Sequence, residues 1–291
     1  MRLPVLAATV ILTSSVGAQT VPRALYADPP RDARHPARNE VLHLPTHGVR
    51  VNGVAFLAAG AGRHPTFVFF HGLPGNEKGH DLAHALRRAG WNVVTFNYRG
   101  SWGSPGSFAF DHTLEDAAAV LGYLRDPANA RTLGVDTSRI VVGGHSMGGW
   151  VAAMTASRDA RLRGAVLISM ADMGAIGAMA NAEAVTFMKD NMETLAGTPE
   201  ALAEDLATGA PRRRLANAAS GLANVPMLVL SSDDGLAPHS DSLVAAVRRL
   251  GNARVTTRYA ATDHSWSDRR VALTSAVLRW LERLPARAAP R

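Results

Sequence analysis

The sequence predicts an α/β fold: a mostly parallel, twisted sheet of about eight strands, with helices on both faces and a helical cap insertion. Two observations predict it. Apolar runs of strand length alternate with helix-like segments along most of the chain. Several of these runs are apolar at every position, which is typical of strands buried on both faces. A chain of 291 residues, 47% of them hydrophobic, can bury the large core that one such domain needs.

The first 18 residues have the pattern of a secretory signal peptide. Arg2 supplies the charged start, residues 3–16 are mostly apolar, and small residues precede a predicted cleavage site after Ala18. The apolar stretch is shorter than the roughly 20 residues of a membrane span, so a short membrane anchor is the less favoured alternative. We therefore expect an exported protein, periplasmic or secreted, with no integral membrane span after processing.

The start of the domain is marked by a change in composition. Residues 19–40 are rich in Pro, Arg, Asp and Ala and predict an extended, loosely packed lead-in. The folded domain is expected over residues 41–291. Residues 49–57 predict a strand that is broken by a hairpin turn at Asn52-Gly53, which would give an antiparallel edge.

The remaining elements follow in alternation. Apolar runs predict further strands at 66–70, 91–96, 140–142, 164–168, 225–230 and 254–259. The segments around them predict helices at 81–88, 113–125, 150–157, 240–250 and 269–284. Thr113 and Asp116 form an imperfect capping box at the start of the second helix. Residues 171–222 contain no strand candidate, and their Ala- and Met-rich sequence predicts a helical cap over the sheet edge where loops gather.

The composition narrows the function classes. The net charge is +7, from 31 basic and 24 acidic residues, and the arginines are scattered over predicted helices. A nucleic-acid site would need clustered basic residues with interleaved aromatics, so we expect no nucleic-acid partner. Weak attraction to an anionic envelope surface is an alternative use of this charge. The lack of cysteine excludes disulfides, thiolate metal sites and a cysteine nucleophile.

A candidate nucleophile lies between a predicted strand and a predicted helix. Gly144, Ser146 and Gly148 form a G-x-S-x-G pattern in the run Gly-Gly-His-Ser-Met-Gly-Gly. This spacing is typical of a sharp turn that lifts a serine out of the sheet, and glycines are needed because side chains there would clash. The following helix brings its positive amino end near the serine. A glycine-rich turn without catalytic meaning is the alternative.

An acid and a base follow the serine in the order that such a site requires. Asp234 lies in the loop after strand 225–230, and His264 lies in the loop after strand 254–259. Both loops leave the carboxyl ends of their strands, on the same side as Ser146. His264 would accept the serine proton, and Asp234 would orient the imidazole and stabilise its charged form. Asp233 is the alternative acid, and Asp263 is disfavoured because neighbouring side chains in a loop rarely face each other.

Other residues are candidates for the oxyanion hole and for substrate contact. The backbone N–H groups of Met147 and Leu73 are the expected oxyanion donors, because Pro74 has no N–H. Trp102 is a candidate aromatic contact in the loop 97–103, which is otherwise a structural loop pinned by Arg99. His71 and His145 are included as substrate-binding candidates, although their motifs favour a structural hydrogen-bonding role. The methionines and Phe187 of the cap either line an acyl pocket or pack helices: Met170, Met173, Met179, Met188 and Met192.

Taken together, these motifs resemble the α/β-hydrolase superfamily over roughly residues 41–284, in its serine-nucleophile esterase, lipase and peptidase-like branch. The matching pieces are His71-Gly72-Leu73-Pro74-Gly75, Asn97-Tyr98-Arg99-Gly100, the Ser146 motif, the Asp234 loop with Pro238, and Asp263-His264. Haloalkane dehalogenases and epoxide hydrolases resemble this fold but have aspartate at the nucleophile position. Ser146 at that position argues against both groups. The resemblance supports the acid assigned to Asp234, four residues before Pro238.

The sequence therefore predicts a serine hydrolase that cleaves a carboxylic ester through an acyl-enzyme, without a metal or organic cofactor. A serine aminopeptidase or amidase with the same residues is the first alternative, and a thioesterase is disfavoured because export separates it from cytosolic thioesters. A non-catalytic binding protein on the same fold is the alternative of a different class. The expected partner is a small-molecule ester or a short peptide, and the oligomeric state stays open.

Overall fold

The computed structural model describes residues 21–284, so the predicted signal peptide lies outside the described residues. Eight strands form the sheet: β1 (Arg38–Thr46), β2 (Val49–Leu57), β3 (His64–Phe70), β4 (Asn92–Phe96), β5 (Val135–His145), β6 (Ala165–Ile168), β7 (Met227–Ser232) and β8 (Val255–Ala260). The helices are η1 (Arg23–Leu25), α1 (His80–Arg88), α2 (Phe110–Arg125), α3 (Pro127–Thr132), α4 (Met147–Ala156), α5 (Met173–Ile176), α6 (Asn181–Lys189), α7 (Pro199–Arg213), η2 (Leu215–Ala218), α8 (Ala237–Arg249) and α9 (Arg270–Glu282).

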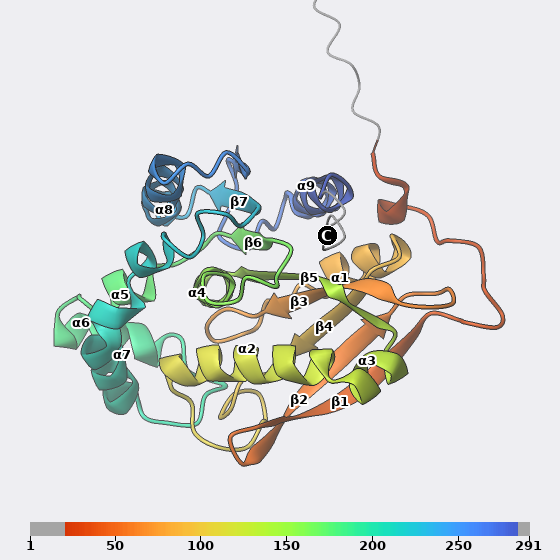
Figure 1. Ribbon diagram of the computed structural model, residues 1–291. Coiled ribbons are helices and arrows are strands. Elements are labelled where there is room, and N and C mark those ends of the chain that lie inside the picture. Colours follow the sequence, from red (N-terminus) through yellow and green to blue (C-terminus); the bar gives the residue numbers. More distant parts are fainter. Residues whose placement is uncertain (1–20, 285–291) are drawn as a thin grey trace, which may run out of the picture.

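A single sheet runs through the centre of the molecule in the order β1-β2-β4-β3-β5-β6-β7-β8 (Figure 1). β1 pairs with β2 and β2 with β4 in antiparallel fashion, and every later pairing is parallel. The predicted sheet of about eight mostly parallel strands is therefore confirmed. Parallel strands end at the same edge, so the loops after β3, β5, β7 and β8 gather on one side of the sheet.

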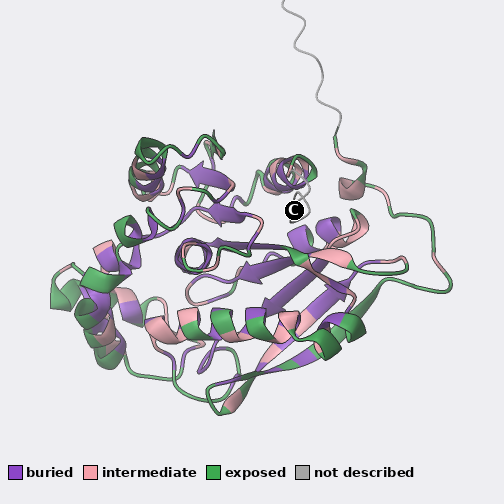
Figure 2. Ribbon diagram, viewed as in Figure 1, coloured by how far each residue is buried: buried purple, intermediate pink, exposed green. Residues whose placement is uncertain are grey.

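Helices cover both faces of this sheet, and its central strands are buried (Figure 2). Alternating side chains of β3 show how the two layers form, because successive residues of a strand point to opposite faces. Val68 and Phe70 belong to the core beneath α2, α4 and α8, whereas Phe67 and Phe69 belong to the core beneath α1 and α9. This explains why β3 is apolar at every position from Phe67 to Phe70.

Three local expectations are wrong. Asn52-Gly53 does not break the second strand, because β2 runs unbroken and the hairpin turn falls at His47-Gly48. A side chain at position 53 would meet the carbonyl oxygen of Thr95 at 2.9 Å, so the glycine serves the close approach of β4. The first strand also begins at Arg38, earlier than the change in composition indicates.

The start of α2 is the third correction. The helix begins at Phe110 and not at Thr113, whose hydroxyl donates to the Phe110 carbonyl oxygen at 2.6 Å. The backbone N–H of Phe110 instead donates to the carboxylate of Asp205 on α7, at 2.9 Å. The cap of this helix comes from a residue 95 positions away, which no local pattern contains.

Between β6 and β7 the chain forms α5, α6, α7 and η2, the region for which the sequence predicts a cap. Arg213 attaches this helical segment to α2. Its side chain is 1% exposed and donates to the carboxylates of Asp111 on α2 (2.8 Å) and Asp205 on α7 (2.7 Å). Its carbonyl oxygen accepts a hydrogen bond from Trp150 of α4 at 2.7 Å. One buried cation therefore joins three helices.

Candidate active site

Ser146 lies in the turn between β5 and α4. Its backbone has φ 58° and ψ −122°, a strained conformation for a residue with a side chain. Its carbonyl oxygen accepts hydrogen bonds from Gly149, Trp150 and Ala171, and its N–H donates to Ile168. These bonds hold the strained turn in place and leave the side chain at the sheet edge.

The glycines around Ser146 are required by close backbone contacts. A side chain at Gly144 would meet the carbonyl oxygen of Gly148 at 2.2 Å, and one at Gly148 would meet the carbonyl oxygen of Phe70 at 1.9 Å. Neither contact leaves room for a carbon atom. The G-x-S-x-G spacing therefore has the steric meaning that the sequence indicates, namely a turn packed directly against the end of β3.

Asp234 and His264 meet at the same edge of the sheet. The imidazole Nδ1 lies 2.7 Å from a carboxylate oxygen of Asp234, a distance at which the Nδ1–H group donates to the carboxylate. The Asp234 side chain is 4% exposed and that of His264 is 38% exposed. The acid is thus sheltered, while the imidazole is open to a ligand.

The two alternative acids make other contacts. Asp233 is exposed, and its N–H pairs with the carbonyl oxygen of Thr262. The Asp263 carboxylate accepts the N–H of Ser267 at 2.8 Å, which closes the turn that follows His264. Among these three carboxylates, only that of Asp234 reaches the imidazole of His264.

A residue of the Ser146 turn supports the imidazole of His264. The Nε2–H of His145 donates to the carbonyl oxygen of His264 at 2.8 Å, and the two rings lie 4.5 Å apart. Within residues 21–284, no hydrogen bond joins the Ser146 hydroxyl to the His264 ring. Such bonds are often long in unliganded enzymes and tighten when substrate binds. His145, the residue before Ser146, therefore holds the His264 loop beside the serine.

The charge states of this group follow from burial and from partners. Burial raises the pKa of Asp234, but hydrogen bonds from His264, Leu236 and Ser232 outweigh it, so the pKa lies below its ordinary value. Burial and the neighbouring His264 lower the pKa of His145 to about 4, although its bond to the His264 carbonyl opposes this shift. At neutral pH the Asp234 carboxyl is therefore ionised and the His145 imidazole is uncharged.

A chain of buried side chains lies behind Asp234. The indole N–H of Trp266 donates to the hydroxyl of Ser169 at 3.0 Å, and this hydroxyl lies 2.7 Å from that of Ser232. The Ser232 hydroxyl also contributes to the lowered pKa of the Asp234 carboxyl. Sequence reasoning missed these residues, because serines at the ends of β6 and β7 carry no recognisable signal.

The loop after β3 packs against the Ser146 turn. A side chain at Gly72 would come within 3.0 Å of the Ser146 Cβ, so glycine permits this contact. The N–H groups of Leu73 and Met147 donate no hydrogen bond among the described residues, and Met147 is the first residue of α4, where the N–H has no partner within the helix. These are the two groups that the sequence predicts as oxyanion donors.

Trp102 packs beside the loop after β3. Its indole N–H donates to the carbonyl oxygen of Pro74 at 3.0 Å, and the Thr194 hydroxyl donates to the same oxygen at 2.8 Å. The ring is 38% exposed, and the Lys78 ammonium lies 4.0 Å from its centre. The helical segment before β7 thus contacts the loop that carries Leu73, through Thr194.

Arg99 pins the loop that presents Trp102, as one of the two sequence interpretations expects. Its guanidinium donates to the fully buried Asp116 at 2.7 Å, and its backbone N–H donates to the other oxygen of that carboxylate. The Thr46 hydroxyl also donates to Asp116 at 2.7 Å. Asp116 therefore ties the loop to β1 and to α2.

His71 is almost completely buried. Its Nδ1–H donates to the Gly72 carbonyl oxygen at 2.8 Å, its ring packs 4.5 Å from that of Tyr98, and burial lowers its pKa to about 4. Burial of His71 and His145 leaves little surface for a substrate, so their contacts favour the structural role. Met170, Met173 and Met188 are likewise buried in the core, which favours helix packing for them.

The described residues contain neither a metal-binding cluster nor a helix suited to cross a membrane. Within residues 21–284, no three His, Asp or Glu side chains are grouped so that they could hold a metal ion. Over the same residues, no helix combines the length and apolar character that a membrane crossing requires.

Comparison with known proteins identifies the class. The chain belongs to the alpha/beta hydrolase family, whose sequence pattern matches residues 67–289. Among curated relatives, an uncharacterized protein of Mycobacterium tuberculosis is 30% identical over 145 residues. The match covers 48% of this chain and 50% of that protein, so the chain spans about half the length of the curated relatives it matches.

Solved structures share the fold. The hyperthermophilic esterase of Pyrobaculum calidifontis has a TM-score of 0.62 and 20% identity, over 86% of this chain and 87% of that one. Brefeldin A esterase, a bacterial homologue of human hormone sensitive lipase, has a TM-score of 0.61 and 21% identity, over 89% and 79%. The acylaminoacyl peptidase of Pyrococcus horikoshii has a TM-score of 0.65 and 16% identity, over 88% of this chain but only 43% of the peptidase.

Proposed function

We propose that this protein hydrolyses a carboxylic ester through an acyl-enzyme on Ser146, with His264 as the base and Asp234 as the orienting acid. The observation that carries the proposal is the 2.7 Å contact between His264 Nδ1 and Asp234, at the sheet edge where the strained turn presents Ser146. A hydroxyl is a weak nucleophile, and an imidazole oriented by a carboxylate is the arrangement that activates it.

The reaction would proceed in two halves. The Ser146 oxygen attacks the ester carbonyl carbon while His264 Nε2 takes the hydroxyl proton. The N–H groups of Leu73 and Met147 stabilise the resulting oxyanion. The C–O bond to the leaving alcohol breaks as His264 returns the proton to it. Water then attacks the acyl group by the same route, and the carboxylic acid and free Ser146 are released.

The depressed pKa of Asp234 supports this scheme. A carboxylate that stays ionised at neutral pH stabilises the imidazolium that forms in each half-reaction. The same residues would cleave an amide if His264 protonated an amine leaving group. The likeness of the fold to the acylaminoacyl peptidase of Pyrococcus horikoshii makes this the second candidate function.

Both candidates are tested by one substrate panel. The mature protein and Ser146→Ala are assayed with p-nitrophenyl esters of graded acyl length and with an aminoacyl p-nitroanilide. The Ser146 hydroxyl makes no hydrogen bond among the described residues, so the substitution should leave the fold intact, which circular dichroism checks. We expect wild-type ester turnover to fall about 10⁴-fold or more in the variant.

The pattern of turnover decides between the functions. Ester turnover that depends on Ser146, without anilide turnover, supports the esterase, and the preferred acyl length measures the acyl pocket. Serine-dependent anilide turnover moves the assignment to the amidase. Wild type that turns over neither substrate, or a Ser146→Ala variant as active as wild type, would contradict the proposed chemistry and leave a binding role.

We also propose that the protein is exported. The support is the pattern of residues 1–18, which lie outside the described residues. Amino-terminal sequencing of protein recovered from the periplasm or medium should begin at Gln19. A retained Met1 in the cytosolic fraction would contradict export.

A further inference from the structure

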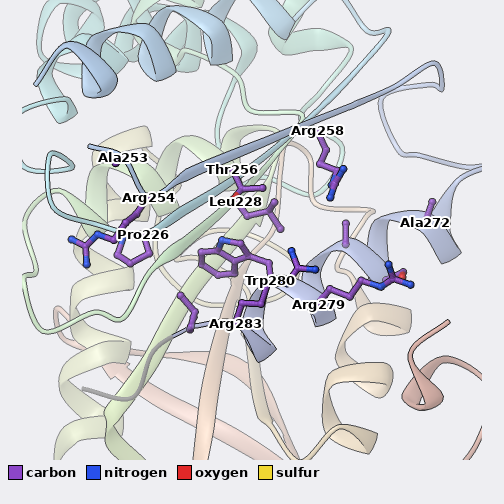
Figure 3. A pocket seen from close by; sticks show the side chains of 13 residues that line it. Pro226, Leu228, Ala253, Arg254, Thr256, Arg258, Ala272, Arg279, Trp280 and Arg283 are labelled. Carbon is purple, nitrogen blue, oxygen red and sulfur yellow. The ribbon is translucent and has the colours of Figure 1, made fainter. Parts of the chain in front are cut away.

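A second concave site lies between β8 and α9, and none of its lining residues belongs to the candidate active site. The groove has a cavity volume of about 440 Å³ (Figure 3). β8 is an edge strand of the sheet, and α9 packs mainly against the core beneath its neighbours. One face of the edge strand is therefore left only partly covered.

The sequence of the two elements explains why the groove is open. Arg254, just before β8, and Thr256 and Arg258 within it lie at alternate positions and line the groove. On the opposite wall, Ala272 and Ala276 lie one helical turn apart on α9. Small side chains on the helix and long ones on the strand leave a channel between the two elements.

The charged side chains that line this groove are all positive. Four arginines line it and no acidic residue does: Arg254, Arg258, Arg279 and Arg283. Glu282, the next acidic residue along α9, lines a different cavity. Arg254 donates to the carbonyl oxygen of Asn224, which fixes its position. The exposed guanidinium groups of Arg258 and Arg283 have no hydrogen-bond or ion-pair partner within residues 21–284.

Arginines on opposite walls of the groove indicate which kind of anion it would bind. A guanidinium presents a planar fork of donors that matches the oxygens of a phosphate or carboxylate. Arg258 comes from β8 and Arg283 directly follows α9, so an anion in the groove would be held from both walls. A phosphate monoester, with its two negative charges, uses such a pair better than a singly charged carboxylate does.

The floor of the groove is apolar. Trp280, Leu228 and Pro226 lie among the arginines (Figure 3). The Trp280 ring is wedged against the backbone at Gly164, where an added side chain would meet it at 2.7 Å. Trp280 is 8% exposed, so it offers a ligand only an edge of its ring, and the rest of the apolar surface comes from the half-buried Pro226 and the alanines of α9. This surface gains from contact with an apolar group, which a free inorganic ion does not supply.

From these features we propose that the groove binds a phosphate monoester carried on an apolar body. The phosphate lies between Arg258 and Arg283, and the apolar body lies along Pro226, the α9 alanines and the exposed edge of Trp280. The seven residues after Leu284 add two arginines and no acidic residue, so the neighbouring sequence has the same sign of charge. The site is separate from Ser146 and does not depend on the proposed esterase activity.

The test is a calorimetric titration of the full mature chain with dodecyl phosphate below its micelle concentration. Inorganic phosphate, which lacks the apolar body, and dodecyl maltoside, which lacks the charge, are titrated in parallel. We expect dodecyl phosphate to bind at least about tenfold more tightly than either, and to bind Ser146→Ala as tightly as wild type. Losing one guanidinium–phosphate hydrogen bond should weaken binding about tenfold. The double variant Arg258→Gln/Arg283→Gln should therefore bind about 100-fold more weakly.

A matched double variant controls for overall charge. Arg50→Gln/Arg249→Gln removes the same charge from exposed positions on β2 and α8 and should leave the affinity unchanged. The proposal is overturned if the groove variant binds like wild type, if both double variants lose affinity equally, or if inorganic phosphate binds as tightly as dodecyl phosphate.

A second measurement distinguishes the source of the ligand. Wild type and the groove variant are sedimented with phosphatidylcholine vesicles that contain or lack phosphatidic acid. Binding that requires both phosphatidic acid and the two arginines indicates a membrane lipid. Arginine-dependent binding of dissolved dodecyl phosphate alone indicates a free organic phosphate. Either result supports the site, and vesicle binding that survives in the groove variant contradicts it as the membrane contact.

Discussion

At the scale of single residues, the candidate site depends on which carboxylate reaches His264. Asp233 and Asp234 are neighbours in sequence, yet one is exposed and the other is held at 2.7 Å from the imidazole. The side chains of adjacent residues point in different directions, so a pair of aspartates offers an internal control for the role of the acid.

We expect Asp234→Asn to reduce ester turnover about 10⁴-fold, because an amide no longer favours the imidazole tautomer that accepts the serine proton. Asp233→Asn should stay within about twofold of wild type, since its side chain is solvated and its backbone bond to Thr262 is unaffected. Steady-state kinetics with the preferred p-nitrophenyl ester measure both. Equal losses in the two variants would refute the assignment of Asp234.

The buried hydroxyl chain behind Asp234 makes a separate prediction. Ser232→Ala removes a donor to an ionised carboxylate, and such a bond contributes about 1.5–3 kcal/mol. We therefore expect kcat to fall about tenfold or more with KM unchanged, and Ser169→Ala, one bond further away, to have a smaller effect. Ser157→Ala is the matched control, because its hydroxyl donates only to the Met154 carbonyl oxygen on α4. A change in KM alone would argue against a positioning role.

At the scale of elements, attachment of the helical segment before β7 depends on burial of charge. Arg212 and Arg213 both donate to Asp111 of α2, at 2.5 and 2.8 Å. The Arg212 side chain is 55% exposed, whereas that of Arg213 is 1% exposed and also holds Asp205. The two ion pairs have similar distances, but the Arg212 side chain is exposed to solvent and the Arg213 side chain is not.

Arg213→Ala should lower the free energy of unfolding by about 3–5 kcal/mol, because it leaves carboxylates without their buried partner. Arg212→Ala should cost less than about 1 kcal/mol, because its pair with Asp111 is screened by solvent. Urea unfolding followed by circular dichroism measures both changes. A small loss in Arg213→Ala would show that the segment is attached mainly by apolar contacts.

At the scale of the whole molecule, two buried histidines couple stability to pH. The pKa values of His71 and His145 are both lowered to about 4, mainly by burial. In the unfolded chain a histidine titrates near 6.5. Between these values the unfolded state binds more protons than the native state, so stability must rise with pH in that window.

We therefore expect the free energy of unfolding to decrease as the pH falls from about 6.5 to about 4. Each proton taken up on unfolding contributes a slope of about 1.4 kcal/mol per pH unit. Urea unfolding at a series of pH values measures this slope. His71→Asn should reduce the slope by the contribution of one proton. His43→Gln, at an exposed position of β1, should leave the slope unchanged. A stability that is flat over this range would contradict the prediction.

Much of this architecture follows from local pattern. The apolar runs locate the six strands from β3 to β8 to within a few residues, except that β5 begins earlier than its apolar run, and the order of Ser146, Asp234 and His264 locates the candidate site. The errors lie where distant residues decide the outcome. Asn52-Gly53 is a turn signal by itself, but the approach of β4 keeps it in a strand. Thr113 is a capping signal, but Asp205 caps α2 from another helix.

What the sequence by itself determined is the fold class, the sharp turn at Ser146 and the candidate acid and base, because these depend on periodicity and on local backbone sterics. Only the tertiary structure decided that Asp234 and not Asp233 reaches His264, that Ser169, Ser232 and Trp266 stand behind it, and that four arginines share one groove. Side-chain direction and burial of charge depend on packing between segments far apart in the chain. No local pattern encodes that packing, because its energy arises only when the sheet has formed.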